Sequence, residues 1–208
     1  MANSKISFYS LFCFIFVMIL FQNCRTYNLA QSLNLKSPIE PKLPALKSSM
    51  DNQSGMLITP FLYGSSDQFE IFDQEVDNNL CNPYGQKFGY IVLRTYYSKF
   101  GLGLGYSVAS GITLLIPNLL GMPMGRPKFE LQATVEILNS KKELIGKYRA
   151  VGTGKSLMAL YYGYGQSDSI RKARVDALNN ALSEIRKQIQ TDAPRLLEEL
   201  GKAGMITD

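Results

Sequence analysis

The segment from Lys128 to Leu138 alternates between polar and apolar side chains, and this pattern restricts the fold more than any other feature of the chain. Successive side chains of a strand point to opposite faces, so the pattern predicts a strand with one buried and one wet face. The turn-forming sequence NSKKE follows, and Leu144 to Val151 is expected to return as a hairpin partner. The inward residues of the first strand are then Phe129, Leu131, Ala133, Val135 and Ile137.

Two stretches with helical spacing provide candidates to cover the buried face. From Ser169 to Gln190 the apolar residues recur as one continuous stripe, which predicts a long helix. Thr191 or Asp192 is expected to cap a second, short helix that carries Pro194 in its first turn. Apolar residues spaced by three and four also predict a helix over residues 67–80.

Two more strands are expected, over residues 55–63 and 88–100, because both segments are rich in apolar, β-branched and aromatic residues. The predicted order is strand, helix, strand, apolar insert, strand, strand, helix, helix. This order indicates an α+β fold with a mostly antiparallel sheet, helices packed on one face, and two C-terminal helices.

The N-terminus has the features of an export signal. Lys5 precedes an uncharged apolar run, Phe8 to Phe21, as in a secretory leader. The run ends in LFQNC at Cys24, and the residues beyond it are polar. This arrangement resembles the signal of a bacterial lipoprotein, in which cleavage precedes the cysteine and its thiol receives lipid. The resemblance implies a signal peptide over residues 1–23 and lipid on Cys24, although the positions before the cysteine depart from the usual pattern, being Phe21, Gln22 and Asn23.

Two alternatives remain for the leader, namely cleavage at another site or an uncleaved anchor, because the uncharged residues 6–23 just reach the minimum for spanning a bilayer. Arg25 follows the cysteine, where aspartate signals inner-membrane retention in the best-studied sorting system, so the outer membrane is favoured by analogy. Residues 24–54 contain three prolines and no sustained periodicity, which predicts a flexible tether. Residues 55–208 are then expected to form a single α+β envelope domain with an apolar, glycine-rich insert at 100–125.

The composition argues against most enzyme classes. The chain contains no histidine, which excludes Ser-His-Asp and Cys-His catalysis and nearly all catalytic zinc sites. Carboxylate chemistry on a glycan is an alternative, but nothing in the sequence places two carboxylates across a cleft. We therefore expect no enzymatic activity, no cofactor and no metal.

Charge and cysteine content limit the partners further. Beyond the leader the chain carries 21 basic against 17 acidic residues, and this net charge of +4 is too small to indicate nucleic-acid binding. Once Cys24 is lipidated, Cys81 has no partner, so no disulfide is expected and Cys81 is interpreted as a small buried apolar residue.

Two glycine-rich motifs only partly match nucleotide-binding loops. GTGKS, Gly152 to Ser156, lacks the glycine that a phosphate-binding loop needs at the position of Arg149. GLGLG, Gly101 to Gly105, lacks the last glycine of the dinucleotide motif, where Tyr106 stands. No nucleotide is expected, and GTGKS is interpreted as a strand-to-helix loop.

Two sets of charged residues have structural interpretations. Asp73, Glu75 and Asp77 alternate like the start of a calcium loop but lack its glycine, so they are interpreted as an acidic helix face. Arg174 lies within the apolar stripe of the long helix, where its head is expected to reach water or to pair with a strand carboxylate such as Glu136.

The stretch from Phe100 to Gly125 has 26 residues and no charge. From Gly101 to Ile116 it alternates large apolar with small residues, as in a membrane barrel wall. Three interpretations stay open: core that covers the sheet, a surface that meets the membrane or a partner, or a pore-forming hairpin assembled from several chains. The candidate contact residues are Leu102, Leu104, Tyr106, Val108, Ile112, Leu114 and Ile116.

The sequence YYGYG places Tyr161, Tyr162 and Tyr164 on a glycine-containing loop. Tyrosine is enriched in binding surfaces, so this is a candidate binding loop. The alternative is a turn whose rings lie against the domain.

The order of elements over residues 128–190, with ATVEILNSKKELIGKYRAVGTG followed by ARVDALNNALSEI, is similar to small envelope lipoprotein domains of the curli-secretion-channel and penicillin-binding-protein-activator type. The resemblance implies a periplasmic α/β domain that binds other proteins, often as an oligomer. We therefore expect a non-enzymatic binding or assembly component of the cell envelope, held to the membrane by lipid on Cys24, with an envelope protein or a second copy as partner. The alternative is an oligomeric, membrane-active or channel-forming subunit that uses residues 100–125.

Overall fold

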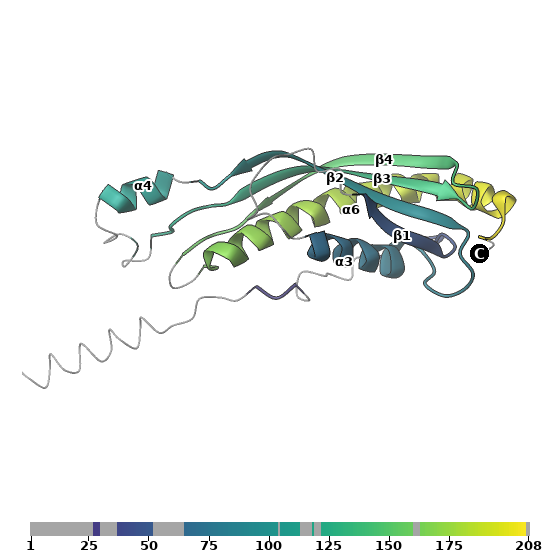
Figure 1. Ribbon diagram of the computed structural model, residues 1–208, viewed down its shortest axis with the longest axis horizontal. Coiled ribbons are helices and arrows are strands. Elements are labelled where there is room, and N and C mark those ends of the chain that lie inside the picture. Colours follow the sequence, from purple (N-terminus) through teal and green to yellow (C-terminus); the bar gives the residue numbers. More distant parts are fainter. Residues whose placement is uncertain are drawn as a thin grey trace, which may run out of the picture.

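A four-stranded sheet is the centre of the fold (Figure 1). The structure is a computed structural model that describes residues 27–29, 37–51, 65–103, 105–112, 118, 122–159 and 163–206. The strands lie in the order β1-β2-β3-β4, with β2, β3 and β4 antiparallel and β1 parallel to β2. The α+β fold with a mostly antiparallel sheet is therefore confirmed. The strands are β1 Leu46–Asp51, β2 Gly89–Gly101, β3 Lys128–Asn139 and β4 Leu144–Lys155.

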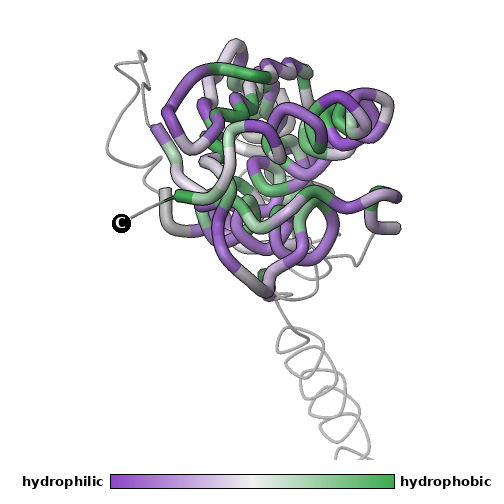
Figure 2. The backbone as a smooth tube through the Cα atoms, turned by 90° about the vertical axis from the view of Figure 1, so that its right-hand side faces the viewer, coloured by the Kyte–Doolittle hydropathy of each residue, from purple (hydrophilic) through white to green (hydrophobic). Residues whose placement is uncertain are grey.

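The alternation that predicted a half-buried strand is confirmed in β3. Its inward side chains, Phe129 to Ile137, are buried in the core. On the other face Lys128 is exposed, whereas Thr134 and Glu136 are buried. Figure 2 shows hydrophilic and hydrophobic residues mixed along the backbone of the elements, as expected where each element has one covered side. The hairpin to β4 is tightened by Asn139, whose side-chain oxygen accepts hydrogen bonds from the backbone N–H groups of Lys141 and Glu143 at 2.9 Å each.

The sheet is covered on one face by a long helix, α6 Gln166–Ala203 (Figure 1). The prediction of two C-terminal helices is wrong, because the helix continues through Pro194. A proline inside a helix costs about 3 kcal/mol, but the buried stripe continues on both sides of it. Ala193, Leu196 and Leu200 are fully buried, so packing of one straight face offsets the lost hydrogen bond.

The predicted helix over residues 67–80 is confirmed as α3 Ser65–Glu75, which continues as a short π-helix, η2 Val76–Leu80. It lies on the same face of the sheet as α6 (Figure 1). Its inward residues Phe72, Val76 and Leu80 are buried, whereas Phe69 is exposed. Cys81 follows η2 and is buried as predicted, and its burial raises the thiol pKa to about 12.

The N-terminal segment is not a flexible tether throughout, and this prediction is wrong for the part that the structure describes. Tyr27 and Leu29 are buried, Ile39 and Leu43 lie in the core, and β1 occupies residues that the tether was expected to include. The sequence did not reveal β1 because this strand, LKSSMD, has few apolar residues. Its inward side is completed by Ser48 and therefore shows no continuous apolar pattern. The predicted strand over residues 55–63 lies outside the described residues.

The predicted period-2 strand in the apolar insert is wrong over Gly105–Ile112, where the structure has a helix, α4. The pairing of β2 with β3 ends at Gly101 and Lys128. Beyond that point the described residues offer no neighbouring strand, and a helix satisfies its own backbone hydrogen bonds. In Figure 1, α4 lies beyond the end of the sheet.

Candidate functional site

The predicted site residues are only partly within the described structure. Val108 and Ile112 lie one helical turn apart on α4 and are 62% and 79% exposed, while Leu102 is half-buried. Of the side chain of Tyr106 nothing is described. The remaining candidates lie outside the described residues: Cys24, Leu104, Leu114, Ile116, Tyr161 and Tyr162.

Tyr164, the described member of the tyrosine loop, packs against the domain. Its ring meets the ring of Tyr27 edge-on with centroids 6.0 Å apart, and its backbone N–H donates to the carbonyl of Leu157 at 3.0 Å. Tyr27 in turn donates its backbone N–H to Asp168 near the start of α6 at 3.1 Å, and the Arg171 guanidinium lies 5.9 Å from its ring centroid. Tyr164 therefore holds the N-terminal segment against the first turns of α6.

The sheet face opposite α6 carries a cross-strand patch of exposed side chains around the half-buried Gln132. Tyr96 on β2 pairs in register with Gln132 on β3, which pairs with Val151 on β4. One step along the strands, Arg94 and Arg149 lie on either side of Thr134. Tyr96 and Val151 are 49% and 56% exposed, which is high for large apolar side chains in the middle of a sheet. We call Arg94, Tyr96, Gln132, Arg149 and Val151 the open-face patch.

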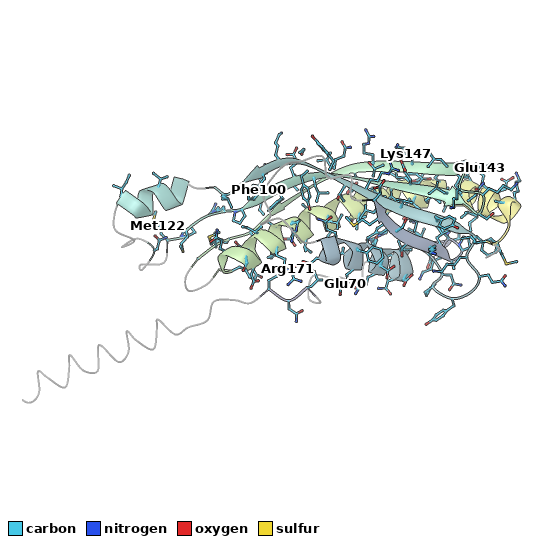
Figure 3. All side chains as sticks on the ribbon, in the orientation of Figure 1. Glu70, Phe100, Met122, Glu143, Lys147 and Arg171 are labelled. Atoms are coloured by element: carbon cyan, nitrogen blue, oxygen red, sulfur yellow. The ribbon has the colours of Figure 1, made fainter. Side chains whose placement is uncertain are left out.

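An ion-pair network borders this patch. Glu136 on β3 lies between Lys147 on β4 at 2.8 Å and Arg94 on β2 at 3.4 Å, and Arg94 also approaches Asp51 on β1 at 3.4 Å. Figure 3 shows Lys147 on the face of the sheet away from α6. The network fixes the direction of Arg94 at the edge of the patch.

Both expectations for Arg174 are wrong: its head does not reach water, since the residue is only 5% exposed, and it does not pair with Glu136, since the two residues lie on opposite faces of the sheet. Arg174 is buried on the inner face and approaches Asp67 on α3 at 4.0 Å. Asp67 also receives two hydrogen bonds from Arg171, at 2.6 and 2.8 Å. The sequence did not indicate this, since it cannot show which carboxylate a second helix brings to the stripe.

A buried polar cluster extends from this pair to β2. Gln68 donates to the Tyr97 hydroxyl and accepts from Thr95 at 3.3 Å. Burial raises the pKa of Tyr97, opposed by the nearby charge of Arg174 and the hydrogen bond from Gln68. The cluster therefore connects α3 to β2 and α6 through neutral and paired groups, which is a structural role.

Of the three residues that alternate like the start of a calcium loop, Asp73 and Glu75 have polar partners and Asp77 is exposed. Glu75 receives hydrogen bonds from Arg186 at 2.5 Å and from Asn79 at 2.7 Å, and Asp73 accepts from Ser48. Among the described residues, no group of three or more histidine, cysteine or acidic side chains is placed to hold a metal ion.

GTGKS is not a loop, because Gly152 and Gly154 lie in β4 and face α6. A Cβ on Gly152 would be 2.7 Å from the Ala181 nitrogen, and one on Gly154 would be 2.5 Å from the Ala177 nitrogen. The glycines and alanines thus let the helix lie directly on the strand, a structural role that the interpretation as a loop did not predict.

Among the helices that the structure describes, none combines the length and the apolar character needed to cross a membrane.

Comparison with known proteins gives no family. No family model matches the chain, and no curated protein matches it. Among solved structures, the chain is similar to a "putative lipoprotein" from Caulobacter crescentus CB15, with 13% identity over 85% of this chain and 97% of the other, and a TM-score of 0.35. A likeness this distant does not bear on the function of the chain.

Proposed function

We propose that the protein is a lipid-anchored lipoprotein of the bacterial cell envelope that acts, without enzymatic activity, by binding another envelope protein through the open-face patch. The observation that carries the proposal is the exposure of Tyr96 and Val151 beside two arginines on the face that α6 leaves uncovered. Tyrosine and arginine are among the residues most enriched at the energetic centres of protein interfaces.

The patch favours a partner of a particular chemistry. Arg94 already forms ion pairs with Asp51 and Glu136, whereas Arg149 is exposed two residues before Val151 on the same face of β4. A carboxylate-bearing surface with an apolar centre would match this arrangement. A second copy docked by a two-fold axis would bring two patches of the same positive charge together, so a different envelope protein is favoured over a homo-oligomer through this face.

The place of the N-terminal segment supports a close anchor. Tyr27 is buried against α6, and Cys24 precedes it by three residues, which span at most about 10 Å. A lipid on Cys24 would therefore hold the domain next to the membrane. By the analogy drawn from Arg25, the outer membrane is the proposed location.

The binding test is photo-crosslinking in cells from a photoreactive residue at Tyr96. The matched control probe stands at Lys187, which is exposed on α6, on the covered side of the sheet. We expect one adduct of defined size from position 96, none from position 187, and at least a tenfold loss of the adduct when Arg149→Glu is added. The Arg149→Lys variant should keep it.

Three results would contradict the binding proposal. They are no adduct from position 96, the same adduct from position 187, or an adduct that Arg149→Glu leaves unchanged. An adduct with the mass of two copies of this chain would replace the proposed heterologous partner by a homo-oligomer.

The anchor is tested separately with Cys24→Ala. Membranes from cells with either form are washed at alkaline pH, and the mass of the N-terminal peptide is measured from the same sample. We expect wild type to stay on the membrane with a lipid-modified Cys24. An unmodified Cys24 in processed protein would overturn the anchor.

A further inference from the structure

One end of the molecule presents apolar side chains to solvent. Val108 and Ile112, on the same face of α4, are 62% and 79% exposed, and Met122 is 45% exposed. Figure 3 shows Met122 at the same end of the molecule as α4, beyond the sheet. No charged residue occurs between Lys99 and Arg126. Large exposed aliphatic groups without interspersed charge are typical of surfaces that another phase or protein covers.

Basic residues gather where this apolar end joins the sheet. Lys128 and Lys155 lie directly opposite each other on β3 and β4, and both are exposed. Arg126 donates its backbone N–H to Leu102 at 3.1 Å, so it stands at the base of the insert. Lys99 lies near the same end of the sheet, among the last residues of β2 before Gly101. Its Nζ is 3.6 Å from Glu130, the one acidic residue of these strand ends. We call Lys99, Arg126, Lys128 and Lys155 the basic collar.

The opposed lysines give the collar a preference for anions. Like charges directly opposite on neighbouring strands repel each other. An anionic group between them would remove this repulsion. The collar and the apolar α4 therefore favour a partner that presents negative charge in front of an apolar interior.

Tyr27, where the described chain begins, lies at the same end. Tyr27, three residues after Cys24, packs on Tyr164 and on Asp168 in the first turn of α6. That end of α6 points toward α4 in Figure 1. A chain anchored through Cys24 would thus face its membrane with α4 and the basic collar.

We propose that α4 and Met122 rest in the interfacial region of an anionic phospholipid bilayer, with the basic collar on the lipid headgroups. The apolar residues would enter the acyl boundary, and the lysines and arginine would bind phosphates around them. With 8 residues, α4 is about 12 Å long, so it lies in the surface and does not cross the bilayer. The choice of membrane rests in part on the proposed anchor, but the two are tested by different measurements.

Because the chain contains no tryptophan, a single introduced tryptophan can report on its own surroundings by fluorescence. Ile112→Trp in the full chain provides one fluorophore on α4, and Val108→Trp repeats it one turn away. Val151→Trp is the matched control, an exposed aliphatic position on the open-face patch. Each variant is mixed with phosphatidylcholine vesicles, with or without phosphatidylglycerol, and quenched by brominated lipid or by aqueous acrylamide.

We expect Trp emission from position 112 to shift to the blue and to be quenched at least twofold by brominated lipid in vesicles that contain phosphatidylglycerol. Emission from position 151 should respond only to acrylamide. Lys128→Ala with Lys155→Ala should lower the ratio of inserted to free probe about 25-fold, at a factor of about five per lysine. The control pair Lys187→Ala with Lys202→Ala removes the same charge from α6 and should leave the ratio unchanged.

Several results would overturn the inference. A probe at 112 that stays open to acrylamide on vesicles would show that α4 does not enter lipid, even where Cys24 is lipidated. Equal insertion into both vesicle types would remove the role of the collar. If the probe is shielded from acrylamide at high protein concentration even without vesicles, α4 would be assigned to a contact between copies of this chain. Insertion by a chain that carries no lipid on Cys24 would support the inference independently of the anchor.

Discussion

Gly152→Ala measures how closely α6 must lie on β4. The new Cβ would overlap the carbonyl oxygen of Ala177 and would lie 2.7 Å from the nitrogen and 2.9 Å from the Cβ of Ala181. Real Cβ atoms almost never come within 3.0 Å of such groups, and the groups here are helix backbone that cannot rotate away. The helix must therefore move outward, and this movement loosens the contact between β4 and the central turns of α6.

The cost can be estimated from overpacking. Inserting a methyl into a well-packed core costs typically about 1–3 kcal/mol, and a clash with backbone belongs at the upper end. For a domain of this size each kcal/mol lowers Tm by about 2–4 °C, so we expect a fall of about 6–12 °C in thermal unfolding followed by circular dichroism. The control is Gly101→Ala in β2, where a Cβ meets nothing within 4 Å and Tm should change little or rise.

A second substitution tests the geometry itself. Gly154→Ala would crowd Ala173 and Ala177, one turn back on the same helix. One outward shift of α6 relieves both clashes, so the double variant should cost less than the sum of the two single variants. A Tm for Gly152→Ala within 2 °C of wild type, or full additivity, would refute the reasoning that the helix backbone rests on the two glycines.

Three further predictions follow from buried or paired groups. Glu75→Gln should destabilise the fold by about 3 kcal/mol in urea unfolding, because it leaves the buried Arg186 without its charge partner. Adding Arg186→Met should restore most of the lost stability. A double variant no more stable than the single one would contradict this. Cys81 should resist iodoacetamide in the native state, since a thiol pKa of about 12 lowers the thiolate fraction about a thousandfold from that of a thiol whose pKa is 9.0. The mass of the labelled peptide should show modification only in denaturant. Rapid labelling of the native protein would argue against the burial of Cys81. The pKa of Asp192 is lowered by its hydrogen bonds from Arg195 and Tyr148, so its contribution to stability is present above the unfolded pKa near 3.8 and is lost as the pH falls through the folded pKa. Asp192→Asn should therefore reduce the loss of unfolding free energy below about pH 4. An unchanged pH dependence would refute the assignment.

The sequence by itself determined the elements whose two sides differ in polarity. The alternation in Lys128–Leu138 predicted β3 and its inward residues, the hairpin to β4 followed from the turn, and the helical spacings predicted α3 and the first two-thirds of α6. These patterns are local, since one residue in two or one in 3.6 must be apolar whatever the partner is. The histidine-free composition also limited the chemistry before any fold was known.

Only the tertiary structure decided which segments join the sheet and which residues meet. β1 has too few apolar residues to stand out, and its place is decided by parallel pairing with β2. The helix continues through Pro194 because a buried stripe on both sides outweighs a local penalty, and Arg174 finds Asp67 because α3 packs beside α6. The insert forms a helix at α4 where the ladder of β2 and β3 ends. Each of these outcomes depends on contacts between residues distant in the chain, which no local pattern records.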